Sequence, residues 1–441
     1  MKTADKVVNI ADIVDNSKMG PFQIGVLVLC SLCLILDGFD VQAMGYVAPA
    51  LVQDWHISKP DLGPVFGAGL FGVLLGALLF SMAADKIGRR PVLIGATVFF
   101  SVLTLLTAQA STLQQLLALR FITGMGLGCI VPNALALVGE YSPRRMRVTM
   151  MMVAGAGFTA GAALGGLISA WLIPVFGWRA VFYFGGAAPL LLSAAMFFLL
   201  PESLHFLVLR GKSPDTIGKW LRRIDPSVAS GGAQYVVHEE KRGGIPVIHL
   251  FRNGRAAPTI LLWIVNFLNL LNLYFLSNWL PTLIKDAGYS TSKAVLAGTT
   301  LQVGGIIGTF ALSWFINRLG FIPSLTTCFV IASVSIALIG QPALSLTLLF
   351  AVVFVAGFCV VGCQPAVFAL AATYYPTYLR STGIGWGSGI GRIGAIIGPV
   401  LAGELIRLNW SAHELFTAAA IPAVISAAVM FSLRSAMAPV R

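Results

Sequence analysis

The sequence predicts an all-α membrane protein in which twelve transmembrane helices form two six-helix halves related by pseudo-symmetry. Three observations support this fold class. Of the 441 residues, 57% are hydrophobic and only 10% are charged, which leaves too little polar surface for a water-soluble particle. Long apolar runs recur along the chain, and residues of its first part reappear in its second part at a nearly constant offset. This composition excludes a soluble enzyme, a nucleic-acid-binding protein and a disordered scaffold.

The apolar runs are long enough to cross a bilayer, because a spanning helix needs about 20 residues. We expect spans at 22–47, 62–84, 91–110, 113–139, 149–174, 179–200, 256–281, 292–316, 320–340, 345–374, 381–407 and 412–434. The polar residues that precede the first span do not resemble a cleavable signal peptide, so we expect this span to be retained.

These spans divide the chain into five parts. They are an N-terminal segment (1–21), a first half (22–200), a linker (201–255), a second half (256–434) and a C-terminal tail (435–441). The linker is polar, and we interpret it as a solvated connection; a regulatory surface is the alternative.

The distribution of basic residues predicts the orientation. Of the 29 Lys and Arg residues, 22 fall on the side that holds both termini and the linker, and 5 fall on the opposite side. Cytoplasmic loops carry an excess of Lys and Arg, so both termini are expected in the cytoplasm. The net charge of +12 therefore reflects topology.

An internal repeat relates the two halves. At an offset of 233 residues, the first half's Phe121, Gly124, Pro132, Leu137, Tyr141, Pro143 and Arg147 correspond to Phe354, Gly357, Pro365, Leu370, Tyr374, Pro376 and Arg380. At an offset of 232, Pro49 corresponds to Pro281 and Gly72 to Gly304. Because the offset covers six spans, the two halves share one orientation, as parallel repeats do.

Charged residues within spans are functional candidates, because an unpaired charge is costly in the bilayer. Asp37 and Asp40 are three residues apart in the first span, so their carboxylates share one helix face. Two carboxylates this close repel each other, which favours a proton carrier. Arg120 in the fourth span lies at a matching depth and could pair with them, and a purely structural pair is the alternative.

Arg392 lies near mid-membrane in the eleventh span, between two glycines. A guanidinium group there suits a substrate carboxylate, and pairing with Asp37 or a backbone carbonyl is the alternative. Asn269 and Asn272 occupy the second-half positions that match the two aspartates. They offer neutral hydrogen bonds to a substrate or between packed helices.

The loop between the second and third spans combines one acid with several bases, and such a turn can form ion pairs that hold one conformation closed. Two residues at the inner end of the fourth span could join it, and the repeat copy of the loop has Asn in place of the acid. The gating candidates are Asp85, Lys86, Gly88, Arg89, Arg90, Glu140, Arg144, Asn317 and Arg318. A purely topological role for these bases is the alternative.

These features resemble the major facilitator superfamily: twelve spans in two halves, a second span that contains G-x-x-x-G and ends in D-K-x-G-R-R, and R-x-x-x-G in the fourth span. D-G-F-D in the first span, Gly-Arg-x-Gly in the eleventh and Pro-Glu-Ser after the sixth are similar to its aromatic acid:proton symporter family. Asn317 departs from the superfamily pattern, which has Asp there.

The resemblance implies a major facilitator fold and proton-coupled import of a benzoate- or phenylpropionate-type anion by alternating access. The cavity would be lined mainly by spans 1, 4, 7 and 10, in a bacterial inner membrane, as part of aromatic catabolism. The expected proton-coupling residues are Asp37, Asp40 and Arg120, and the expected substrate-binding residues are Arg392, Asn269, Asn272, Phe39, Tyr274, Trp386 and Gln364. A proton-driven exporter of drugs or other amphiphiles and a non-transporting sensor of aromatic acids are the alternatives.

The expected partners are the aromatic anion, protons and the lipid bilayer, and no nucleic acid. We expect a monomer without enzyme activity, which uses the proton gradient and no cofactor or metal. The six cysteines all fall in apolar segments without histidine or acidic neighbours that could complete a metal site, so we interpret them as packing residues.

Overall fold

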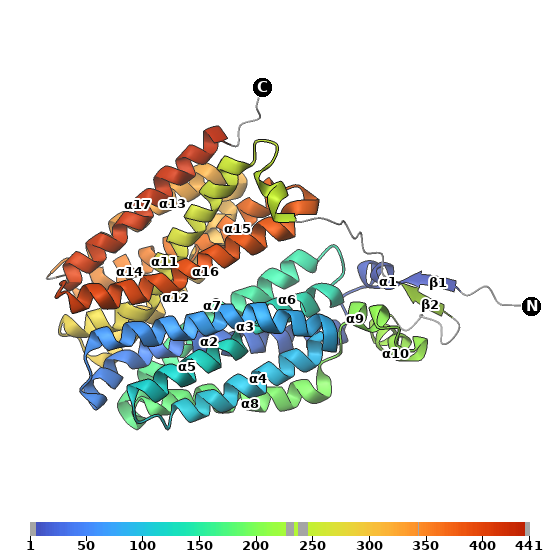
Figure 1. The fold of residues 1–441 in the computed structure, drawn as a ribbon, viewed down its shortest axis with the longest axis horizontal. Helices are drawn as coiled ribbons and strands as arrows, with labels where there is room; N and C mark the ends of the chain where they lie inside the picture. Colours follow the sequence, from blue (N-terminus) through green and yellow to red (C-terminus); the bar gives the residue numbers. More distant parts are fainter. Residues whose placement is uncertain (1–5, 226–232, 237–245, 343, 437–441) are drawn as a thin grey trace, which may run out of the picture.

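The computed structural model describes residues 6–225, 233–236, 246–342 and 344–436, and its long helices form two bundles (Figure 1). Within these ranges, twelve segments are long and apolar enough to cross a membrane. The predicted all-α membrane fold with two six-span halves is confirmed.

The helices of each half follow the predicted spans. The first half contains α2 (Pro21–Trp55), α3 (Leu62–Ile87), α4 (Arg89–Thr107), α5 (Leu113–Leu127), α6 (Ile130–Tyr141), α7 (Arg147–Phe176) and α8 (Arg179–Leu199). The second half contains α11 (Ala256–Asp286), α12 (Thr291–Leu319), α13 (Phe321–Ile339), α14 (Leu346–Val360), α15 (Cys363–Tyr374), α16 (Thr377–Arg407) and α17 (Ala412–Ala436). The first and seventh spans extend past their predicted ends, because hydropathy marks the membrane core and not the end of the helix.

Two spans expected as single helices are each broken in two. The fourth span is divided between α5 and α6, and the tenth between α14 and α15. Pro132 and Pro365 explain both breaks, because proline lacks the N–H that would bond to the carbonyl four residues earlier. Those carbonyls belong to Gly128 and Val361, which lie at the two breaks. Since the two prolines are repeat equivalents, the same kink occurs in both halves.

The two halves meet at one end and diverge at the other (Figure 1). They diverge toward the end that holds the linker, which we name the linker side, and meet at the opposite end, which we name the closed side. There α2 packs on α11, α7 on α12 and α3 on α16. Small residues allow this close approach: a Cβ atom on Gly403 would lie 3.1 Å from the Cα of Gly63 in the other half.

Part of the linker folds against the N-terminal segment on the linker side. The strand β1 (Lys6–Asn9) pairs in parallel with β2 (Ala233–Val236), and the short helices α1 (Ile10–Asn16), α9 (Leu204–Leu209) and α10 (Pro214–Ile224) pack beside them. We refer to these five elements as the cap. Ile10 and Val14 are buried with Ile217 and Leu221 of α10. The predicted solvated connection is therefore partly ordered, because α10 has an apolar face that the N-terminal segment covers.

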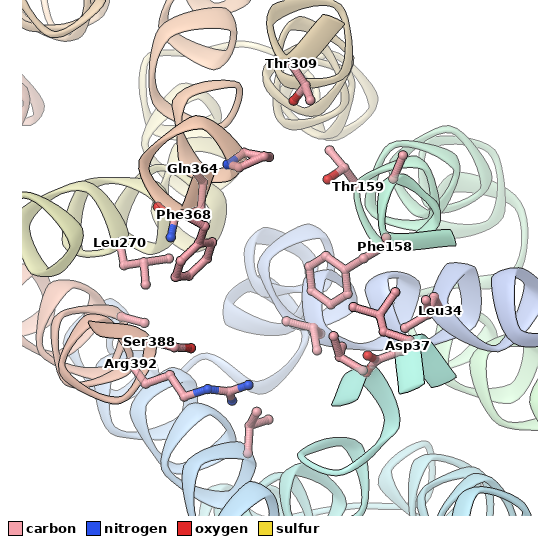
Figure 2. Close-up of a pocket in the computed structure, with 18 of the residues that line it drawn as sticks. Leu34, Asp37, Phe158, Thr159, Leu270, Thr309, Gln364, Phe368, Ser388 and Arg392 are labelled. Atoms are coloured by element: carbon pink, nitrogen blue, oxygen red, sulfur yellow. The ribbon is translucent and has the colours of Figure 1, made fainter. Parts of the chain in front are cut away.

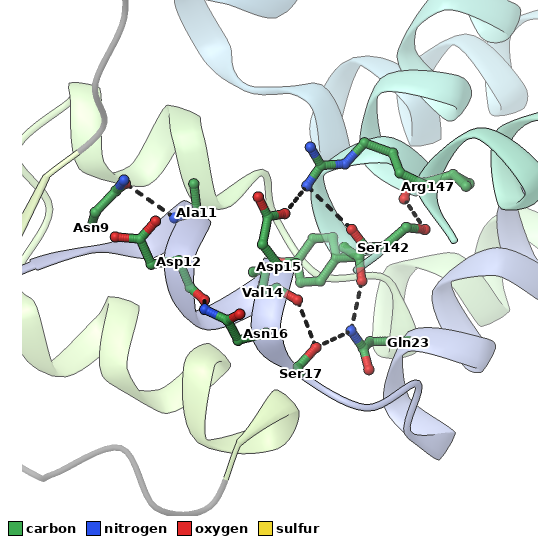
Figure 3. A network of polar contacts seen from close by, with 12 residues as sticks. Asn9, Ala11, Asp12, Val14, Asp15, Asn16, Ser17, Gln23, Ser142 and Arg147 are labelled. Atoms are coloured by element: carbon green, nitrogen blue, oxygen red, sulfur yellow. Dashed lines mark hydrogen bonds and ion pairs between the residues drawn. The ribbon is translucent and has the colours of Figure 1, made fainter. Parts of the chain in front are cut away.

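A polar network fastens the cap to the first half (Figure 3). Asp15 pairs with Arg147 at the start of α7. Gln23 donates to Ser17 Oγ (3.1 Å) and to the carbonyl oxygen of Tyr141 (2.8 Å). By contrast, the 3-10 helix η2 (Pro246–Phe251) at the end of the linker packs on α11 and α16 of the second half. The two ends of the linker are thus attached to different halves.

Candidate functional site

A cavity of about 480 Å³ lies between the two halves. Its walls come from α2, α3, α5, α6 and α7 of the first half and from α11, α12, α15 and α16 of the second. They are mostly apolar, and Phe158 and Phe368 face the same space from opposite halves (Figure 2). The polar residues of the lining are Asp37, Thr159, Tyr274, Thr309, Gln364, Ser388 and Arg392. An apolar cavity with a few polar groups is the usual form of a small-molecule site.

Asp37 and Arg392 are the two charged residues of this lining, and they come from different halves. The Arg392 side chain extends into the cavity toward the first half, where Asp37 lies (Figure 2). Neither side chain makes a hydrogen bond or an ion pair with any residue that the structure describes. Asp37 is only 2% exposed, and a buried carboxyl group without a donor is costly in its ionised form. The cavity therefore holds one carboxyl group suited to proton exchange and one cation available to an anion.

Asp40 points away from the cavity and is fully buried. Arg120 Nη2 donates to Asp40 Oδ2 (3.0 Å) and to its carbonyl oxygen (3.1 Å). Thr104 Oγ1 donates to Asp40 Oδ1 (2.7 Å). The ring of Phe182 lies against the guanidinium group, 5.8 Å from its central carbon. The sequence grouped Asp40 and Arg120 with Asp37, whereas the structure makes them a closed ion pair that joins α2 to α4 and α5.

Gln364 lines the cavity, and two asparagines of α11 hold its amide. Its Nε2 donates to Asn266 Oδ1 (2.8 Å), and Asn269 Nδ2 donates to its Oε1 (2.6 Å). Asn269 therefore positions Gln364 and does not itself line the cavity. Asn272 is buried outside the lining, and its Oδ1 has no hydrogen-bond partner within the described ranges.

Two aromatic residues predicted to contact a ligand do not line this cavity. Phe39 is buried inside the first half, where its ring packs 5.4 Å from that of Phe184. Trp386 is 50% exposed and stacks on another tryptophan, 6.2 Å between centroids. Tyr274 does line the cavity. Sequence reasoning missed Phe158 and Phe368, since many of the 28 phenylalanines lie in spans and only helix rotation distinguishes them.

Thr159 and Thr309 were also missed as lining residues. They lie across the cavity from Arg392 in the view of Figure 2, near Gln364. Charges and asparagines inside spans do not point to these two residues. The signal that could have identified them is a hydroxyl group in an otherwise apolar span.

Part of the predicted gating loop forms a network with the first half and the start of the linker. Gly88 has φ of +105°, a conformation that favours glycine and allows the sharp turn between α3 and α4. The Arg89 side chain pairs with Glu140 of α6. The backbone N–H groups of Arg89 and Arg90 both donate to Glu202 Oε1, at 3.0 and 3.1 Å. Glu202 was quoted in the sequence only as part of a motif, and here it holds the loop.

Other gating candidates lie outside this network. Arg144 is exposed and has no hydrogen bond or ion pair among the described residues, and Lys86 is also exposed. Asn317 is exposed, and the Arg318 guanidinium lies over a tryptophan ring at 4.3 Å from its centroid. The side chain of Asp85 lies outside those that the structure describes. Arg144, which the sequence places beside this network, does not join it in this conformation, because its side chain is exposed.

The described residues include no cluster of three or more His, Cys, Asp or Glu side chains that could hold a metal ion. All six cysteines are buried and none forms a disulfide. The cavity itself therefore remains the candidate site.

Comparison with known proteins identifies the fold family. The model of the Major Facilitator Superfamily matches residues 30–340 and 262–441. The chain belongs to the major facilitator superfamily. It is 38% identical over 421 residues to a 4-hydroxybenzoate transporter of Pseudomonas aeruginosa, covering 95% of this chain and 94% of the relative. It is also 38% identical over 423 residues to a gallate transporter of Pseudomonas putida, covering 96% and 94%.

A solved structure supports the same fold. A bacterial homologue of the human lysosomal transporter Spinster, in an inward-facing and unoccupied conformation, superposes with a TM-score of 0.73 at 18% identity. The match covers 95% of this chain and 98% of that one. The chain is thus a multi-pass membrane transporter of the major facilitator superfamily and not an enzyme.

Proposed function

We propose that this transporter imports an aromatic carboxylate together with protons by alternating access. The observation that carries the proposal is the placement of Asp37 and Arg392, from different halves, in one apolar cavity with two phenylalanine rings. The names of the relatives, which transport 4-hydroxybenzoate and gallate, support the same class of substrate.

Arg392 would bind the carboxylate. Its planar guanidinium group matches a carboxylate with two parallel hydrogen bonds, and no described residue competes for it by direct contact. The hydroxyl groups of Tyr274 and Ser388 belong to the same lining and add neutral donors. The aromatic ring of the substrate would lie between Phe158 and Phe368, where offset or edge-to-face contacts are favourable.

Asp37 would carry the proton. In its ionised form it attracts Arg392 across the cavity and repels the substrate anion. Protonation removes both effects, so the carboxylate then binds Arg392 and the loaded cavity has no net charge. A neutral cavity can be enclosed by apolar walls at little cost, because no unpaired charge is buried.

The conformation described here would be the inward-facing one. The excess of Lys and Arg on the linker side predicts that this side faces the cytoplasm, and the halves diverge toward it (Figure 1). Import then requires a second conformation, in which the closed side opens and the linker side closes.

Transport by purified protein in vesicles tests the proposal. A symporter accumulates labelled 4-hydroxybenzoate when the outside is more acidic than the lumen, and a protonophore abolishes the accumulation. Accumulation only when the lumen is more acidic would instead identify a proton-driven exporter. Binding without flux under either gradient would identify a sensor. Asp37→Asn should retain binding and lose accumulation against a gradient, and accumulation equal to wild type in this variant would refute the role of Asp37.

A further inference from the structure

A buried hydrogen-bonded cluster separates the cavity from the closed side. Gln42 on α2 lies five residues beyond Asp37, about 7–8 Å farther along the helix. Its amide donates to the carbonyl oxygen of Ser277. Gln302 Nε2 donates to Gln42 Oε1 (3.4 Å) and to Ser277 Oγ (3.1 Å). We refer to Gln42, Ser277 and Gln302 as the latch.

The latch joins the two halves directly. Gln42 belongs to the first half, whereas Ser277 on α11 and Gln302 on α12 belong to the second. Ser277 and Gln302, like Gln42, lie about one helical turn from a residue that lines the cavity. Ser277 follows Tyr274 by three positions, and Gln302 precedes Ile306 by four. The side chains are 5%, 1% and 4% exposed, so water does not replace their hydrogen bonds in this conformation. The latch is therefore a dry polar layer between the halves.

The backbones of the two halves also touch at the latch. A Cβ atom on Gly45 would lie 2.6 Å from the carbonyl oxygen of Ser277. Gly45 and Ser277 are separated by 232 residues, the offset that also relates Pro49 to Pro281. Equivalent positions of the two halves thus meet each other, which places this contact beside the pseudo-symmetry axis.

Two ion pairs also join the halves on this side, and both are exposed. Lys59 pairs with Asp286 (2.7 Å) and Arg407 with Asp61 (3.8 Å), with side chains 32% to 52% exposed. Exposed pairs contribute little and are screened by salt. A buried amide that loses its partner is far more costly, because nothing replaces the bond. The latch is therefore the polar contact best suited to keep the closed side shut.

We propose that the latch is a positioning element of the transport cycle, and that Gln42 sets the balance between the inward-open and outward-open conformations. The inference rests on the proposed alternating-access function and adds a residue that lines no part of the cavity. When the closed side opens, the three polar groups separate and water takes the place of their partners. Loss of the Gln42 amide therefore destabilises only the conformation in which the latch is closed.

Spin-label distances in the purified full chain test this proposal. Labels at Gln53→Cys on the end of α2 and Ala287→Cys after α11 report the separation of the halves, and both positions are exposed. Gln42→Leu keeps the side-chain size, but it leaves the buried carbonyl oxygen of Ser277 without the Gln42 donor and removes one of the two acceptors of Gln302 Nε2. We expect the ratio of the population with the long label-to-label distance to the population with the short one to rise roughly five- to hundredfold, the range that corresponds to one buried unsatisfied group. Gln302→Leu, made on the other half, should shift it in the same direction.

Asn133→Leu is the matched control. Asn133 is also buried, at 5% exposure, but its amide bonds to Cys129 within the first half. This variant should leave the distances unchanged. Unshifted distances in both latch variants, or an equal shift in the control, would overturn the proposal. If the latch variants shift the distances but the wild-type protein shows no transport under any gradient, the proposed function fails while the latch stands.

Discussion

Replacement of Asp40 by Asn should destabilise the protein strongly, whereas the same replacement of Asp37, one helical turn away, should not. Asp40 is fully buried and accepts hydrogen bonds from Thr104 and Arg120. In Asp40→Asn the Arg120 guanidinium stays buried, at 4% exposure, without a counter-charge. Asp37 has no such partner among the described residues, so its replacement by a neutral amide breaks no ion pair.

The structure gives the scale of this difference. Removal of one partner from a buried ion pair costs about 3–5 kcal/mol. For a unit the size of the first half, each kcal/mol lowers the melting temperature by about 2–4 °C. We therefore expect a decrease of roughly 6–20 °C for Asp40→Asn. For Asp37→Asn we expect a change of less than about 3 °C, as for a substitution that breaks no pair.

Thermal unfolding of the detergent-purified variants, followed by intrinsic fluorescence, measures these shifts. Thr104→Val serves as the control, because it removes one hydrogen bond to Asp40 and keeps the ion pair. It should cost about 1 kcal/mol. A structural role for the Asp40–Arg120 pair is refuted if Asp40→Asn melts within about 2–3 °C of wild type, or if Asp37→Asn loses as much stability as Asp40→Asn.

Three further predictions concern the cavity. Arg392→Ala should raise the Kd for an aromatic carboxylate by roughly 30-fold or more in equilibrium binding, since it removes a charged hydrogen-bond partner; an unchanged Kd would reassign the carboxylate site. The affinity of the wild-type protein for the aromatic carboxylate should fall as the pH rises, because an ionised Asp37 competes for Arg392. Binding by Asp37→Asn should be independent of pH over the same range. A parallel pH dependence in both proteins would contradict the coupling. Phe158→Ala and Phe368→Ala should each weaken binding about three- to tenfold, whereas Trp386→Ala should leave the Kd within about twofold; a larger effect of Trp386→Ala would place the ring elsewhere.

The membrane fold could be predicted because its signals can be read along the linear sequence. Apolar runs mark the spans, and a constant offset between residues such as Pro132 and Pro365 marks the two halves. The same two prolines also carried the signal for the broken helices. The length of the apolar runs alone does not reveal these breaks, since a proline within such a run leaves its hydropathy high.

The site was predicted only in part, because helix rotation decides which side chains face the cavity. Asp37 and Asp40 are three residues apart and thus about 60° apart around the helix axis. This angle is enough for one to reach the cavity and the other to reach Arg120. No pattern in the sequence fixes the rotation of α2 against its neighbours. The cap was missed for a different reason: β1 and β2 have four residues each and pair across more than 200 positions.

The pairing of β1 with β2 also limits how far the two halves can separate. It attaches residues up to Val236 to the first half, while η2 begins at Pro246 on the second half. Only ten peptide units therefore connect the halves on this side, and a chain of that length spans at most about 35 Å. Without β1, the tether would start near the end of α10 and have about twice that reach. The strand at Lys6–Asn9, remote from the cavity, thus sets an upper bound on the width of the opening on the linker side.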